Sequence, residues 1–130
     1  MQNTIDLNAA LKKLKSLLVE HNLSEPGNLA SKVYATILFI PEGKVVTYQE
    51  IARVINTKGF RAIGQVLKRN PLPIIIPCHR VVCSNLSIGG YMGAKEGKFI
   101  EKKQALLSKE GVVFNKNYKL SDVKFLHFFI

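Results

Sequence analysis

Residues 74–82 read Ile-Ile-Ile-Pro-Cys-His-Arg-Val-Val, so a cysteine, a histidine and an arginine interrupt an otherwise apolar segment. A buried segment of this kind typically delivers its polar residues to a pocket, and Pro77 indicates a turn directly before Cys78. A thiol becomes a good nucleophile as a thiolate, which a neighbouring imidazole or cation favours. Two interpretations remain open at this point. Cys78 is either reactive, with His79 as its base through a water or the turn, or a structural cysteine beside a surface His-Arg pair.

The length and charge of the chain narrow the class of protein. Its 130 residues, 47% hydrophobic and 22% charged, are typical of one globular domain with its own core. The net charge of +10 predicts a polyanionic partner, most simply nucleic acid, although a basic surface also serves solubility.

Cys78 and Cys83 are too few for a disulfide framework and poorly spaced for zinc, so we expect no metal and no other cofactor. With no recognisable signal peptide or membrane span, we expect a cytoplasmic monomer that does not bind membranes.

Helical periodicity dominates the first part of the chain. Apolar residues recur at three- and four-residue spacing over residues 4–20 and again over residues 29–39, which predicts two amphipathic helices. Asp6 or Asn8 is the expected N-cap of the first helix. The lysines between its leucines indicate a solvated face.

A second pair of helices is predicted further along. Thr47 and Glu50 form a capping-box pattern, which predicts a helix over residues 48–55. Residues 56–59 are a turn ending in glycine, and residues 60–69 read as the next helix. This succession predicts a helix-turn-helix, with basic residues on its second helix. Many helical hairpins bind no DNA, but together with the charge the pattern favours DNA binding.

The last part of the chain alternates loops with one more helix. Residues 88–93 are rich in glycine but lack the Gly-Lys-Ser/Thr of a P-loop, so the glycines more plausibly let the backbone approach a ligand. We expect a helix over residues 99–109 and a hairpin over residues 112–120. The apolar tail, residues 123–130, should pack on the body.

Taken together, these residues resemble a known family. Residues 76–81, Ile-Pro-Cys-His-Arg-Val, are similar to the active-site signature of the O6-alkylguanine-DNA alkyltransferases, also called methylated-DNA–protein-cysteine methyltransferases. The resemblance extends over residues 29–111 through six further motifs in the same order: Ile40-Pro41-x-Gly43, Thr47-Tyr48-x-x-Ile51-Ala52, Arg61-Ala62-x-Gly64, Arg69-Asn70-Pro71, Gly89-Gly90-Tyr91 and Leu106-Leu107-x-x-Glu110-Gly111.

The resemblance implies a fold and a division of the chain. We expect a mainly helical α/β fold, namely a winged-helix-like domain with a helix-turn-helix and a small β-hairpin. Residues 1–28 would form an N-terminal helix and linker, and residues 29–111 the DNA-binding and active-site domain. Residues 112–130 would form a hairpin and tail packed on that domain.

The resemblance also implies a single-use reaction. Cys78 would take the alkyl group from O6 of guanine in DNA, or from O4 of thymine, and keep it. His79 would remove the thiol proton, through a water, while Glu110 orients the imidazole and stabilises its charge. Asn70 would brace the loop that carries the cysteine.

Further roles follow from the same resemblance. Tyr48 would donate a hydrogen bond to the guanine ring, the carbonyls of Cys78 and Val81 would accept from its exocyclic amine, and Tyr91 would wall the pocket. Ser84 and Met92 complete the expected substrate-binding set. Because the lesion lies inside a duplex, it must be extruded, and Arg61 would fill the gap. Small side chains would let the second helix enter the minor groove. The remaining expected DNA contacts are Ala62, Gly64, Thr47, Gln49, Lys68, Arg69 and Arg80.

Three departures from the family pattern accompany the resemblance. The additional N-terminal domain of many relatives has no counterpart in residues 1–28, and about five residues are inserted near residues 95–99. The third departure is a set of substitutions: Met92 stands where serine is common, and Gln65, Val66 and Leu67 replace smaller or different residues of the second helix. The alternative function is a non-enzymatic, lesion-binding or regulatory helix-turn-helix protein. Cys78 discriminates between the two, because the lesion-binding relatives lack this cysteine.

Overall fold

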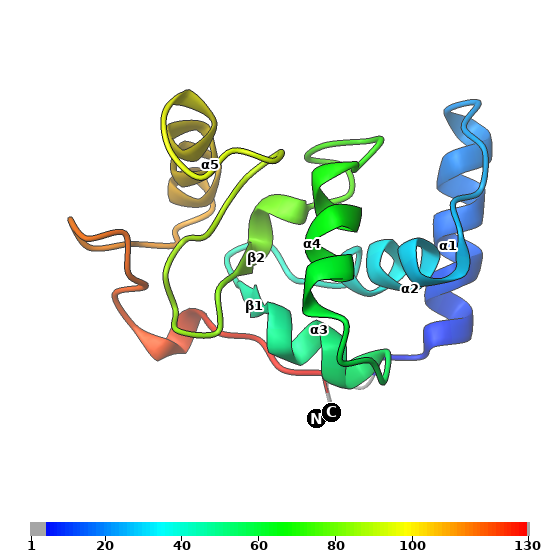
Figure 1. Cartoon of the computed structure of the whole chain (residues 1–130), viewed down its shortest axis with the longest axis horizontal. Helices are drawn as coiled ribbons and strands as arrows, with labels where there is room; N and C mark the ends of the chain where they lie inside the picture. The colour runs from blue at the N-terminus through cyan, green and yellow to red at the C-terminus, as the bar shows by residue number, and fades with distance from the viewer. Residues whose placement is uncertain (1–4, 130) are drawn as a thin grey trace.

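Figure 1 shows the computed structural model of the chain, which describes residues 5–129. Its elements are α1 (Leu7–Glu20), α2 (Asn28–Ile37), β1 (Val46–Thr47), α3 (Tyr48–Val54), α4 (Phe60–Lys68), the 3₁₀ helix η1 (Cys78–Arg80), β2 (Val81–Val82), α5 (Lys98–Lys109) and the 3₁₀ helix η2 (Val123–Phe125). This architecture confirms the predicted mainly helical α/β fold. Within the described residues, no helix is long and apolar enough to cross a membrane.

The first two helices pack against each other at one end of the molecule (Figure 1). The Asp6 carboxylate caps α1 by accepting the backbone N–H groups of Asn8 at 3.0 Å and Ala9 at 3.2 Å. The helix therefore begins at Leu7, later than predicted, and residue 4 lies outside the described part of the chain. Its apolar side is buried at four-residue spacing, as an amphipathic helix requires, through Ala10, Leu14 and Leu18.

Helices α3 and α4 form the predicted helix-turn-helix. Thr47 caps α3, because its hydroxyl accepts the Glu50 N–H at 3.2 Å. The second half of the predicted capping box is wrong. The Glu50 carboxylate does not return to Thr47 but binds the Arg53 guanidinium at 2.7 and 2.8 Å and accepts the Phe129 N–H at 2.7 Å. Each helix ends one residue earlier than predicted, and α4 packs on α2 and α3.

A small parallel sheet lies at the centre of the molecule. β1 and β2 pair in register, Val46 with Val81 and Thr47 with Val82. The C-terminal tail lies beside this sheet: the Val45 N–H donates to Phe125 O and the His127 N–H to Val45 O, both at 2.8 Å. The tail thus contacts the body of the molecule as far as Phe129. The core around the sheet draws fully buried side chains from distant parts of the chain: Val33, Ile37, Val46, Ile51, Ile63, Ile76 and Leu107.

The predicted hairpin over residues 112–120 is shorter than expected. Its antiparallel pairing consists of one bridge between Phe114 and Leu120. The turn between them is closed by the Asn115 N–H, which donates to Lys119 O at 2.8 Å, and by the Asn115 carboxamide, which accepts the Asn117 N–H at 2.8 Å. This short ribbon follows α5 and leads into the tail.

Candidate active site

The loop between α4 and η1 positions Cys78. The Asn70 side chain spans this loop: its amide nitrogen donates to Ile76 O at 2.7 Å and its oxygen accepts the Leu72 N–H at 2.9 Å. Ile76 is fully buried, as expected for the segment before Cys78. The expectation that the whole segment is buried is wrong for Ile74 and Ile75, which are about half exposed. The reason is a tight turn in which the Ile76 N–H bonds back to Leu72 O at 2.8 Å, leaving Ile74 and Ile75 within the turn.

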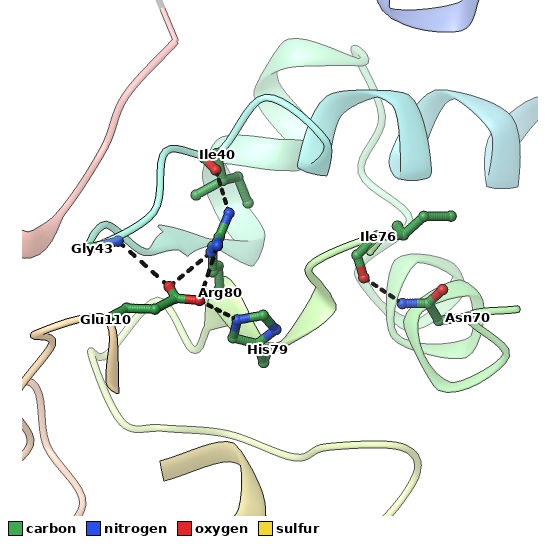
Figure 2. Close-up of polar contacts among 7 residues, drawn as sticks. All are labelled: Ile40, Gly43, Asn70, Ile76, His79, Arg80 and Glu110. Carbon is green, nitrogen blue, oxygen red and sulfur yellow. Dashed lines mark hydrogen bonds and ion pairs between the residues drawn. The ribbon is translucent and has the colours of Figure 1, made fainter. Parts of the chain in front are cut away.

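His79, Arg80 and Glu110 form a buried ionic cluster (Figure 2). Glu110, the residue directly after α5, accepts from His79 Nε2 at 2.8 Å and from Arg80 Nε and Nη2 at 2.8 and 2.9 Å. Burial raises the pKa of the Glu110 carboxyl, but the hydrogen bonds from Arg80 and His79 outweigh it and hold the pKa below its ordinary value. The carboxylate therefore stays charged and fixes the imidazole from one side. Backbone groups from the loop before β1 join the cluster at Ile40 O and Gly43 N.

The position of Arg80 corrects its predicted role as a DNA contact. Its guanidinium binds Glu110 through two nitrogens and donates to Ile40 O at 2.9 Å, and its side chain is only 16% exposed. The short 3₁₀ helix η1 turns this side chain inward toward the end of α5, so Arg80 belongs to the ionic cluster rather than to the surface.

The second ring nitrogen of His79 has no hydrogen-bond partner within the described residues, although it is buried. Because Nε2 donates to the carboxylate of Glu110, Nδ1 carries the lone pair of the neutral ring. Burial lowers the pKa of His79 below 6.5 by more than Glu110 raises it. At neutral pH, His79 is thus an uncharged base with a free acceptor atom.

Cys78 is a neutral thiol at rest. It is 5% exposed, and burial raises its pKa against the opposing effects of the Asn70 hydrogen bond and the nearby Lys103 ammonium. A thiol in this environment needs a base to become a nucleophile. The neutral ring of His79, the next residue, is the candidate for this base.

Lys103 is a site residue that the sequence analysis missed. It is fully buried on α5, and its ammonium donates to three carbonyls: Val81 O at 2.7 Å, Ile88 O at 2.5 Å and Gly90 O at 3.0 Å. Burial lowers its pKa to about 8, so it remains charged at neutral pH. The contact also modifies the predicted role of Val81, since one lone pair of its carbonyl is already used.

The sequence does contain a signal for Lys103. It lies between Ile100 and Leu107 at spacings of three and four residues, which puts a charged residue on the buried side of α5. A lysine at such a position requires internal acceptors.

A cavity of 450 Å³ opens between the helix-turn-helix, Cys78 and the glycine-rich segment. It brings together seven of the predicted site residues: Tyr48, Arg61, Gly64, Lys68, Cys78, Tyr91 and Met92. Burial raises the pKa of Tyr48 to about 12, so its hydroxyl keeps its proton and serves as a donor. The cavity thus combines a thiol, a phenol donor and basic side chains of α4.

A tight turn forms one wall of this cavity. The N–H groups of Tyr91 and Ala94 bond to each other's carbonyls at 2.9 and 3.0 Å, and both central residues, Met92 and Gly93, have positive φ angles. A Cβ atom on Gly93 would lie 2.9 Å from Lys68 Cε, so the turn packs closely on the stem of Lys68. The turn therefore lies against α4 beside the cavity.

Other predicted residues lie outside this cavity. Ser84, expected to bind substrate, is exposed and is not among the residues that line it. Ala62 and Arg69 line a different groove, between α2 and α4. Thr47 uses its hydroxyl as the α3 cap, and Gln49 is exposed on α3. No group of three or more His, Cys, Asp or Glu side chains suited to a metal occurs in residues 5–129.

Comparison with known proteins identifies the family. Residues 28–112 match the family model described as "6-O-methylguanine DNA methyltransferase, DNA binding domain". The chain belongs to the 6-O-methylguanine DNA methyltransferase family. The family member of Methanocaldococcus jannaschii named methylated-DNA–protein-cysteine methyltransferase is 44% identical over 108 residues, which cover 82% of this chain and 62% of that protein. The chain spans only 49 to 62% of the length of the first curated family members that it matches.

Solved structures of the family superpose on the fold. The O6-methylguanine-DNA methyltransferase of Pyrococcus kodakaraensis matches with a TM-score of 0.57 and 41% identity, covering 66% of this chain and 47% of that one. Schizosaccharomyces pombe Atl1, in complex with damaged DNA containing O6-carboxymethylguanine, matches with a TM-score of 0.66 and 29% identity, covering 80% of this chain and 98% of that one.

Proposed function

We propose that this protein repairs DNA directly, by irreversible transfer of the alkyl group of O6-alkylguanine to Cys78. The observation that carries the proposal is a buried thiol directly followed in the chain by an uncharged His79, whose ring is fixed by Glu110. The 44% identity to a methylated-DNA–protein-cysteine methyltransferase supports the same reaction. O4-alkylthymine is a second substrate of the same chemistry.

The proposed reaction is a single displacement. His79 takes the thiol proton, through a water, and the sulfur attacks the alkyl carbon. The carbon–sulfur bond forms as the bond from that carbon to O6 breaks, and its electron pair stays on the guanine. Tyr48 stabilises this developing charge by donating a hydrogen bond. The guanine anion then takes a proton from water, and His79 returns the thiol proton to the hydroxide that is left. The alkyl group stays on Cys78, so each molecule acts once.

Double-stranded DNA containing the lesion is the proposed partner, and the solved complex of Atl1 with damaged DNA supports it. The target base must leave the stack to enter the 450 Å³ cavity, which costs a few kcal/mol. Arg61, exposed near the start of α4, would fill the gap. A Cβ atom on Gly64 would meet nothing within 4 Å, so this glycine leaves space for close approach of the DNA backbone.

Additional DNA contacts belong to the same proposal. Lys68 at the cavity and Arg69 at the end of α4 would bind phosphates, with Ala62, Thr47 and Gln49 beside the DNA. We propose that a monomer acts, in the cytoplasm, and that residues 1–28 and 112–130 support the DNA-binding and active-site unit of residues 29–111.

The test is incubation with duplex DNA containing O6-methylguanine, followed by intact mass measurement and peptide mapping. We expect the mass of one added methylene unit per molecule, on the peptide that contains Cys78. Cys78→Ser should abolish transfer, whereas the matched variant Cys83→Ser should still accept one methyl group. Label on Cys83, or more than one equivalent repaired per protein molecule, would refute the assignment.

The alternative function is lesion binding without chemistry. The extensive match to Atl1, which covers 98% of that chain, favours it as the second candidate. In that case the protein would bind the O6-methylguanine duplex but gain no mass. Cys78 and the cluster behind it favour the transfer reaction, because simple binding requires neither a thiol nor a base.

A further inference from the structure

Phe60 is a large apolar side chain that the core does not use. It is the first residue of α4, and 48% of it is exposed. The turn of residues 56–59 fixes its backbone, with the Phe60 N–H donating to Lys58 O at 3.0 Å. A half-exposed phenyl ring at this position gains little from the fold itself.

The surroundings of Phe60 indicate what the ring contacts. Phe60 lines the cavity that contains Cys78, together with its neighbour Arg61. One and two turns further along α4, Gly64 leaves open space and Lys68 adds a positive charge at the same cavity. A ligand that matches both features has aromatic faces and negative charges, as the stacked bases and phosphates of DNA do.

We propose that Phe60 is an apolar wedge, which presses against the base pair next to the extruded nucleotide while Arg61 occupies the vacated position. Extrusion leaves the faces of the flanking bases uncovered, and a charged guanidinium covers them poorly. A phenyl ring restores stacking there, as apolar wedges do in other proteins that open the minor groove. This inference rests on the proposed function, because a wedge serves only a protein that extrudes a base.

The test compares two substrates. Duplex DNA containing O6-methylguanine requires extrusion, whereas free O6-benzylguanine does not. For Phe60→Ala we expect the single-turnover rate on the duplex to fall about ten-fold more than the rate with the free base, because stacking on one base is lost. Phe60→Leu, which keeps an apolar side chain, should lie between Phe60→Ala and the unmodified protein.

The chain offers a matched control. Phe99 is the second residue of α5, is 50% exposed and does not line the cavity. Phe99→Ala removes the same ring from a similar position, and should leave both rates unchanged. Thermal unfolding of the Phe60 variants shows whether α4 remains folded, as alanine at a helix start should allow.

A binding measurement keeps the inference independent of the chemistry. A duplex with 2-aminopurine beside the lesion reports unstacking as increased fluorescence. Cys78→Ser protein should increase the signal, and adding Phe60→Ala should reduce that increase. Equal rate losses of Phe60→Ala on duplex and free base would mean that the ring supports the pocket. An unchanged rate on the duplex would mean that the ring contacts no part of the DNA. Either result would refute the role of Phe60 as a wedge. Absence of any methyl transfer by the unmodified protein would refute the proposed function instead, while the fluorescence change still tests the wedge.

Discussion

Replacing Glu110 with glutamine tests the ionic cluster most directly. The carboxylate accepts three short hydrogen bonds, one from His79 at 2.8 Å and two from Arg80 at 2.8 and 2.9 Å. The amide of Glu110→Gln keeps one oxygen and turns the other acceptor into an NH₂ donor, which must face a donor of His79 or of Arg80. The negative charge is lost in either orientation.

The expected loss of stability follows from burial. The Glu110 side chain is 9% exposed and that of Arg80 is 16% exposed, so solvent screens this pair weakly. Breaking a buried pair by removing one partner costs about 3–5 kcal/mol. A domain whose stability lies above the lower end of the usual range of about 5–15 kcal/mol remains folded at 25 °C after such a loss. Urea unfolding should show this decrease, whereas the matched variant Glu101→Gln, an exposed carboxyl on α5, should change little.

The expected loss of activity follows from the tautomer of His79. An amide NH₂ that donates to Nε2 moves the ring proton to Nδ1, which then cannot accept the thiol proton. A general base contributes about 10²–10⁴ to a rate, so the single-turnover reaction of Glu110→Gln with free O6-benzylguanine should slow by at least about 100-fold. This substrate avoids any effect of base extrusion. A folded Glu110→Gln protein that reacts within about three-fold of the unmodified rate would refute the role of Glu110 in positioning the base.

Three other predictions concern helix α4, which we propose enters the DNA groove, and His79, the proposed general base. Gly64→Ala should raise the free energy of unfolding by about 0.5–1 kcal/mol, because alanine favours a helix and the added methyl group meets no protein atom within 4 Å. The same methyl group occupies the proposed DNA side of α4, so the affinity for duplex DNA should fall. Unchanged affinity by fluorescence anisotropy would contradict this. Arg61→Ala should slow the duplex reaction more than the free-base reaction, whereas His79→Ala should slow both; equal losses for Arg61→Ala would exclude the gap-filling role. Because burial lowers the pKa of His79, the free-base rate should fall as the pH decreases through that lowered pKa, with a midpoint below 6.5; a midpoint at or above 6.5 would argue against His79 as the base.

The sequence predicted those features of the fold that depend on residues close together in the chain. Periodicity located the helices, Thr47 was read correctly as a cap, Asp6 was one of two candidate caps, and the turn before α4 followed from its glycine. The partner of Glu50 could not be predicted in this way, because the Phe129 N–H that it accepts lies 79 residues further along the chain. Local rules favoured a reciprocal capping box, and a long-range contact replaced it.

In the candidate site, too, the features that depend on distant parts of the chain could not be predicted. The family resemblance associated Cys78 and His79 with Glu110, but no local pattern reveals where an arginine side chain points. Arg80 was therefore read as a surface cation, although its partner Glu110 lies 30 residues away and is buried with it. Lys103 was missed for a different reason: its place on the apolar side of α5 was readable, but its three carbonyl partners come from β2 and the segment after it, whose positions only the fold defines.

The positions of the Glu110 carboxylate and the Lys103 ammonium explain how a buried thiol could react. In the proposed reaction, transfer of a proton from Cys78 to His79 creates two charges, a thiolate and an imidazolium, in a region where isolated charges are costly. The proton passes from Cys78 to a residue of the ionic cluster, so the net charge of the buried region as a whole does not change. Each new charge also forms near an opposite one already in place, the imidazolium against Glu110 at 2.8 Å and the thiolate under the influence of the Lys103 ammonium, which lowers the pKa of Cys78. Burial thus keeps the thiol neutral and unreactive at rest, while Glu110 and Lys103 make the ionised pair accessible when an alkyl carbon is present to accept the sulfur.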